Sequence, residues 1–270
     1  MLLTPRPINP GWARRWTKQS LELFYRQPNL FLANATLFLL ANGFIPGKLQ
    51  FVAFSAVLLV GILFSSLRAA DRNSGQAWST TYHYFRQTLP DLLKLSFVIC
   101  VALYLTQTVF NGLMEGILLL VPHAMALAQA TPRSAMSPFW IQNAVEDAPN
   151  VLTLGIIWPG MLQLIFLTQA VGHAPVRHFQ LGYYGAMLNP DIAYRLLAFG
   201  FLMCVFLTSV FTAAPSLLLG YVLMGVFAFL YLWLGSWGYL WCREMFEGIR
   251  ENARATLPQN VDQKRLSPIN

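Results

Sequence analysis

Six long runs of apolar residues limit how this chain can fold more than any other feature. A helix that crosses the hydrocarbon core of a bilayer needs about 20 mostly apolar residues, with a range of about 17–25. Six stretches meet this requirement: 29–45, 49–67, 95–114, 151–171, 196–214 and 217–241. We therefore predict an all-α fold, a polytopic membrane helical bundle with six transmembrane helices.

The composition supports the same fold class. Of the 270 residues, 56% are hydrophobic and only 11% are charged, and the mean hydropathy is +0.50. Soluble domains average about 25% charged residues. So few charged side chains cannot cover this much apolar surface in water, which excludes a water-soluble enzyme.

Short turns and a recurring motif group the six predicted spans into three hairpins. Pro46-Gly47 separates spans one and two, and Pro215-Ser216 separates spans five and six. Aromatic residues, then proline, then Asn or Asp precede spans one, three and five, in FYRQPNL, YFRQTLPDLL and YYGAMLNPDI. Proline suits the first turn of a helix because its missing N–H would be unpaired there. We expect helices to begin at these prolines, followed by residues that favour the helix dipole: Asn29, Asp91 and Asp191. Whether the hairpins are true repeats stays open.

The distribution of cations predicts the orientation. Sixteen of the 18 Lys and Arg residues fall on one side of a six-span topology, and cytoplasmic loops carry such an excess. We predict a multi-pass protein of the bacterial inner membrane with both termini cytoplasmic. It divides into a cytoplasmic segment 1–28, a membrane domain 29–241 with a periplasmic loop 122–150, and a cytoplasmic tail 242–270. Residues 1–27 hold no apolar core of the length a signal peptide needs.

The charges also bear on partners. Basic residues at the cytoplasmic face are expected to meet anionic lipid headgroups. The chain shows no basic helix or aromatic signature typical of nucleic-acid binding. The predicted partners are the lipid bilayer and either other membrane proteins or further copies of this chain, with no nucleic acid.

Tryptophans gather at the predicted membrane boundary. Segment 11–27 mixes basic and apolar residues, as expected for an amphipathic helix on the inner leaflet, and segment 76–88 is rich in aromatics. The last span carries a tryptophan at every fourth position, which forms a stripe on one helix face. A ligand-stacking site is an alternative, but an inner-leaflet belt or a helix-packing seam is favoured. We predict cytoplasmic interfacial helices with these interfacial anchors: Trp12, Trp16, Trp78, Trp233, Trp237 and Trp241.

Span three carries a polar face at membrane depth. Its members lie at i, i+3, i+4, i+7 and i+11, and so share one side of a helix: Tyr104, Gln107, Thr108, Asn111 and Glu115. Polar groups in lipid are costly and turn toward partners or water. They indicate either a hydrophilic path or hydrogen bonds between helices. Gly112 and Gly116 flank the same region as a GxxxG pair.

Span four contains a candidate helix break at Pro159 and Gly160, which would kink the helix. Broken helices line binding sites in transporters, although many structural spans also hold proline. No Asp, Glu, Lys or Arg falls near a span midplane, which argues against a proton or ion relay.

Catalytic motifs are missing from the sequence. None of the four histidines belongs to an HExxH motif, and His173 and His178 are expected to be solvated in a loop. The Gly235-Ser236 pair has no histidine in the other spans to activate it. The three cysteines have no metal-site spacing. We predict no enzyme activity, no cofactor and no metal.

The N-terminal third resembles a family of proteobacterial inner-membrane proteins of unknown function. The similarity lies in a tryptophan-bearing amphipathic helix, an aromatic-x-x-Gln-Pro start of the first span, and a span end near Ile-Pro-x-Gly. The corresponding residues here are Trp16, Phe24, Gln27, Pro28, Ile45, Pro46 and Gly47, followed by the similar LRAADRNSG of 67–75. The resemblance implies a six-span inner-membrane protein and no activity for any residue.

Two functions fit these patterns. The first is a non-catalytic structural or accessory subunit of a membrane complex for secretion, transfer or envelope assembly. The alternative is a permease or channel for a small neutral or amphipathic solute, in which the polar face of span three and the break at Pro159 would line one cavity.

Overall fold

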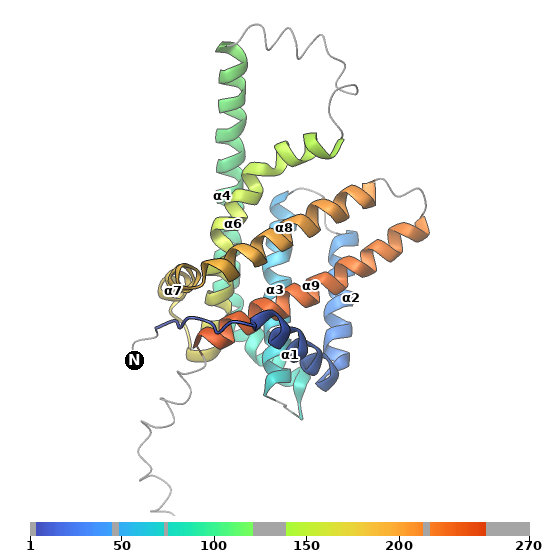
Figure 1. Ribbon diagram of the computed structural model, residues 1–270, viewed down its shortest axis with the longest axis vertical. Coiled ribbons are helices and arrows are strands. Elements are labelled where there is room, and N and C mark those ends of the chain that lie inside the picture. Colours follow the sequence, from blue (N-terminus) through green and yellow to red (C-terminus); the bar gives the residue numbers. More distant parts are fainter. Residues whose placement is uncertain (1–3, 45–48, 73–74, 121–138, 213–216, 247–270) are drawn as a thin grey trace, which may run out of the picture.

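The computed structural model describes residues 4–44, 49–72, 75–120, 139–212 and 217–246 (Figure 1). Within these ranges the protein is all-helical, with eight helices and no strand, as predicted. The helices are α1 (Trp12–Arg26), α2 (Pro28–Phe44), α3 (Leu49–Asp71), α4 (Ala77–Leu120), α6 (Phe139–Val171), α7 (Pro175–Leu188), α8 (Pro190–Thr212) and α9 (Leu217–Phe246).

Three of the described helices are long and apolar enough to cross a membrane. Their qualifying sections are Phe54–Asp71 in α3, Ala77–Leu113 in α4 and Leu219–Phe246 in α9. Shorter apolar sections occur in α2, over Pro28–Ala41, and in α6, over Gly155–Val171. The chain therefore has the helices of a membrane protein, and each of the six predicted apolar stretches overlaps one of its helices.

Prolines begin two of the three predicted hairpins. Helix α2 begins at Pro28 and α8 at Pro190. In contrast, Pro90 lies inside the 44-residue helix α4, so the predicted interfacial segment 76–88 and span three form one helix. Thr88 and Leu92, on either side of this proline, are fully buried. Packing against neighbouring helices holds α4 together where proline removes one helical hydrogen bond.

The core lies where α3, α4 and α6 pack together, with α7 and α9 around them. Close approach of α3 to α4 depends on Gly61, because a Cβ there would lie 2.4 Å from Leu92 Cδ1. Helix α7 lies in a connection for which no helix was predicted. It crosses α6 so closely that a Cβ on Gly182 would lie 2.5 Å from the Pro159 carbonyl oxygen.

Helix α1 packs on the C-terminal part of α9 (Figure 1). Glu244 of α9 accepts hydrogen bonds from Arg15 (2.6 Å) and from the Trp16 indole N–H (2.7 Å). Ser236 donates to Ser20 over 2.8 Å, and both are fully buried. These contacts fix the first described helix against the last.

The packing of the helices corrects the prediction that Trp16 of α1 and Trp241 of α9 are interfacial anchors. Trp16 and Trp241 are fully buried, so protein surrounds both side chains. Trp12 packs against Trp16 and against Trp237, with ring centroids 4.7 and 5.6 Å apart. For the tryptophan stripe of α9, the sequence favours either an inner-leaflet belt or a helix-packing seam. Trp237 and Trp241 fit the helix-packing seam. Trp233 is half-buried, and Trp78, which is 59% exposed, keeps the surface position of an anchor.

Candidate functional site

The predicted polar residues of α4 lie on the outside of the protein. Tyr104 is 60% exposed, Thr108 and Asn111 are exposed, and Gln107 is half-buried. We call these four residues the α4 polar face. The side chain of the fifth predicted member, Glu115, lies outside the described residues. This part of α4 rises toward the end of the helix that stands apart from α2 and α3 (Figure 1).

The polar face is organised by hydrogen bonds within α4. The Gln107 side-chain amide donates to Asn111 Oδ1 over 3.2 Å. The Thr108 hydroxyl donates to the Tyr104 carbonyl oxygen over 2.8 Å. At the adjoining Gly112, a Cβ would meet no atom within 4 Å. The face thus combines ordered amide groups with a flat glycine surface, a combination that lets another helix approach closely.

A second group of polar residues lies where α4, α6 and α7 meet, with three members buried and His173 exposed, as predicted for that histidine. Asp91 is almost fully buried, and its Oδ2 lies 3.0 Å from His173 Nδ1 and 3.4 Å from the Thr168 hydroxyl. Thr168 also lies 3.4 Å from Nδ1 of the buried His178. We call these four residues the Asp91 cluster. If His178 Nδ1–H donates to Thr168, and Thr168 donates to Asp91, each proton is used once.

The Asp91 cluster corrects two predictions. Asp91 does not act at the start of a helix, because α4 begins 14 residues earlier, at Ala77. His178 is not a solvated loop residue, since only 1% of it is exposed. Burial lowers the pKa of His178 from 6.5 to about 4, the Asp91 charge opposes this shift, and the Arg177 charge adds to it. His178 is therefore neutral at physiological pH.

The chemistry of the Asp91 cluster is that of a structural hydrogen-bond network. Asp91 Oδ2, the Thr168 hydroxyl and one ring nitrogen of each histidine contact one another, and these residues come from α4, α6, α7 and the connection between α6 and α7. Among the residues that the structure describes, no group of three or more His, Cys, Asp or Glu side chains has the arrangement to hold a metal ion. Nearby, Arg68 is buried, donates to the Phe166 carbonyl oxygen over 3.2 Å and packs over the Tyr84 ring. The Asp91 cluster connects α4, α6 and α7, and the contacts of Arg68 connect α3 to α4 and α6.

The candidate break at Pro159 and Gly160 is a buried helix crossing. Helix α6 continues through both residues, which contact α7 rather than a polar cavity. A Cβ on Gly160 would lie 2.7 Å from the Phe179 ring. The small size of Gly160 and Gly182 permits the contact of α6 with α7.

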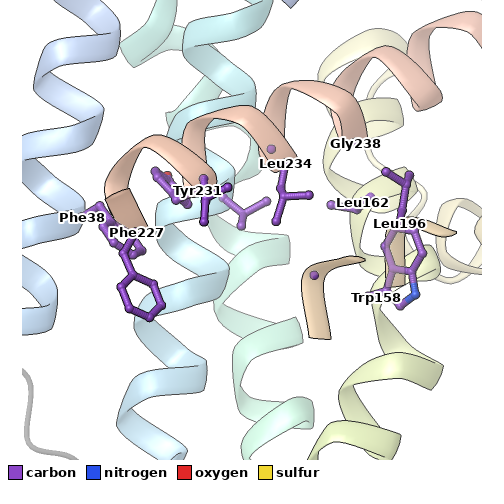
Figure 2. A pocket seen from close by; sticks show the side chains of 12 residues that line it. Phe38, Trp158, Leu162, Leu196, Phe227, Tyr231, Leu234 and Gly238 are labelled. Atoms are coloured by element: carbon purple, nitrogen blue, oxygen red, sulfur yellow. The ribbon is translucent and has the colours of Figure 1, made fainter. Parts of the chain in front are cut away.

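A pocket of about 320 Å³ lies between α2, α3, α6, α8 and α9 (Figure 2). Its walls are aromatic, aliphatic and glycine residues, and its one side-chain hydroxyl belongs to Tyr231. The lining includes neither Pro159 nor any member of the α4 polar face. Neither of the two features that the transport hypothesis requires in one cavity therefore lines this pocket.

Comparison of the chain with protein-family models, with curated proteins and with solved structures finds no match. The resemblance of the N-terminal third to a family of inner-membrane proteins therefore stays a prediction. The function has to be argued from the arrangement of the chain's own residues.

No strong signal in the sequence points to the Asp91 cluster. His173 and His178 are five residues apart, whereas Asp91 lies more than 80 positions away in the sequence. One weak signal was available, since Asp91 follows an in-helix proline and lies next to apolar Leu92 and Leu93. A carboxylate in such an apolar run is costly to expose to lipid, so its presence indicates a hydrogen-bonding partner inside the protein.

Proposed function

We propose that this protein is a non-catalytic, multi-pass subunit of a bacterial inner-membrane complex, and that the α4 polar face is its contact with another membrane helix. The observation that carries the proposal is the outward exposure of Tyr104, Thr108 and Asn111 on a helix long and apolar enough to cross a membrane. A partner helix would cover these groups.

The energetic argument starts from the cost of polar groups in lipid. Amide and hydroxyl groups at membrane depth lower their free energy by turning toward a protein partner. Hydrogen bonds between membrane helices contribute on average about 0.6 kcal/mol each. Gln107 and Asn111 already hold each other in place, so little side-chain entropy is lost when a partner binds them. The exposed Gly112 beside them offers room for a second backbone.

The proposed topology has six spans, with both termini in the cytoplasm. The excess of cations on one side supports it, as does the contact of α1 with the end of α9. The Asp91 cluster then lies toward the cytoplasmic side. Anionic lipid headgroups would meet the basic residues of that face, and Trp78 is exposed to reach the interface.

Secretion, transfer or envelope assembly is the kind of process in which we place this subunit, because such complexes contain non-catalytic membrane proteins. Transport of a neutral solute is the weaker alternative. No residue of the α4 polar face lines the described pocket, so this pocket gives transport no support.

The test removes the α4 polar face and measures assembly. The triple variant Gln107→Leu, Thr108→Val and Asn111→Leu is compared with Thr36→Val. Thr36 of α2 is also exposed, and its hydroxyl also donates to the carbonyl four residues earlier. The control therefore removes a hydroxyl of the same geometry from another surface.

Size-exclusion chromatography with light scattering, in mild detergent, gives the mass of each assembly. We expect the wild type and Thr36→Val to migrate as the larger assembly. The triple variant should associate about 20-fold more weakly, from three contacts of about 0.6 kcal/mol. A wild type that stays a lone monomer in detergent and in lipid nanodiscs would contradict the proposal. Mass spectrometry of the assembly distinguishes a second copy from a different protein.

A further inference from the structure

The apolar pocket is elongated along α9 (Figure 2). Six of its lining residues lie at i, i+3, i+4, i+7, i+8 and i+11 on one face of that helix: Phe227, Leu230, Tyr231, Leu234, Gly235 and Gly238. At 1.5 Å per residue they extend over about 16 Å. Phe38 and Phe227 lie at one end, and Trp158 and Leu196 lie at the other.

The shape suits a single hydrocarbon chain. A volume of about 320 Å³ over this length gives a mean cross-section of about 20 Å². Carbon atoms in contact are about 3.5–4 Å apart, so a slot of this width has room for a chain of methylene groups.

The chemistry of the walls favours an apolar ligand. The Tyr231 hydroxyl already donates to the Leu59 carbonyl oxygen over 2.6 Å, so it has no proton left to donate to a ligand. The Tyr231 ring stacks on Phe38, with centroids 4.6 Å apart. A polar solute would lose its hydrogen bonds to water and meet walls whose side-chain polar groups are the Trp158 indole N–H and the Tyr231 oxygen.

The space in the pocket exists partly because α8 presents a glycine to it. A Cβ on Gly200 would meet no atom within 4 Å, so this wall is open. In contrast, a Cβ on Gly235 would lie 2.2 Å from Leu63 Cδ2, and this glycine serves the contact of α9 with α3. Gly200 is therefore the position from which a side chain could fill the pocket.

We propose that the pocket binds one acyl chain of a bilayer lipid. Its walls lie in the middle of α9, a helix long and apolar enough to cross a membrane, so hydrocarbon from the surrounding bilayer can reach it. An empty apolar cavity destabilises a protein roughly in proportion to its volume, and an acyl chain that fills it removes this cost. The site does not depend on the α4 polar face.

The experiment maps where a lipid chain contacts the full-length protein. The wild type, Gly200→Leu and Gly225→Leu are reconstituted in vesicles of phosphatidylethanolamine and phosphatidylglycerol. A trace of phospholipid with a diazirine in one acyl chain is added and photolysed, and the labelled peptides are sequenced. Gly225 of α9 is the matched control, because it is a helical glycine with no atom within 4 Å of its Cβ and lies outside the pocket lining.

We expect wild type and Gly225→Leu to be labelled on the pocket walls, around Leu196–Gly200 and Phe227–Gly238, and Gly200→Leu to lose this labelling. Labelling spread equally over exposed residues such as Leu202 and Phe229 in all three proteins would overturn the proposal. So would wall labelling by a diazirine fatty acid without labelling by the phospholipid. The wild-type map alone decides the question if Gly200→Leu does not fold.

Discussion

At the scale of single residues, the Asp91 cluster explains how a carboxylate and the imidazole of His178 can be buried in an apolar chain, with the exposed His173 at its edge. Asp91 contacts both His173 and Thr168, so its charge is hydrogen-bonded although it is buried. An unpaired buried charge would cost several kcal/mol. The hydrogen bonds of the cluster therefore satisfy its buried groups and connect α4, α6 and α7. Helix α7 begins after Gly172 turns the chain at φ +100°.

The titration of His178 gives a prediction at this scale. Its pKa is lowered by burial to about 4 in the folded protein, from 6.5. Between these values the unfolded chain binds a proton that the folded protein does not. The contribution of His178 to the free energy of unfolding is therefore fully present above pH 6.5 and is lost as the pH drops toward 4. We expect the melting temperature in detergent to fall over this window, with a shallower slope for His178→Asn.

The comparison of slopes separates titration from packing. The loss of the imidazole lowers the melting temperature of His178→Asn at every pH, whereas only titration changes its dependence on pH. Equal slopes for wild type and variant between pH 6.5 and 4 would show that His178 is not the group that titrates.

At the scale of elements, local sequence rules predicted two of the three helix starts at prolines, and tertiary packing overrode the third. Pro28 and Pro190 begin helices, as expected. Pro90 does not, because buried contacts of Thr88 and Leu92 carry α4 through it. The helix α7 was missed for a related reason. Its sequence contains glycines that lower helix propensity, and Gly182 is needed for contact with α6.

The crossing of α6 and α7 supplies a second prediction. A methyl group on Gly182 would lie 2.5 Å from the Pro159 carbonyl oxygen and 2.6 Å from the Gly160 Cα, and both are backbone atoms that cannot move independently. We expect Gly182→Ala to destabilise the protein by about 1–3 kcal/mol, the usual cost of overpacking. Thermal unfolding in detergent measures it.

Gly225→Ala is the control for this prediction. Its Cβ would meet no atom within 4 Å, and alanine favours a helix by about 0.5–1 kcal/mol over glycine. The control should therefore unfold at the same temperature as the wild type or slightly higher. A drop of equal size in both variants would mean that helix content, rather than the crossing, sets the stability.

At the scale of the whole molecule, hydropathy predicted the helical class because the apolar runs are long and few charges interrupt them. Contacts between distant segments leave no such trace in one sequence. The pattern of Trp16, Ser20 and Leu23 fits a helix on a lipid surface equally well, and their burial against α9 depends on Glu244 and Ser236, more than 200 residues away. The polar face of α4 was found, but its outward direction depends on which neighbours α4 has.

The contact between α1 and α9 predicts the topology independently of the charge count. Glu244 near the end of α9 binds Arg15 and Trp16 of α1, so both must lie in the same compartment, and the chain between them must cross the bilayer an even number of times. Reporter domains that work only in the cytoplasm, fused to either end of the chain, should both be active. A reporter inserted after Leu120, before the predicted periplasmic loop, should be inactive. Activity at only one end would contradict both the six-span topology and the docking of α1 on α9, since a helix cannot pack against a segment across the membrane.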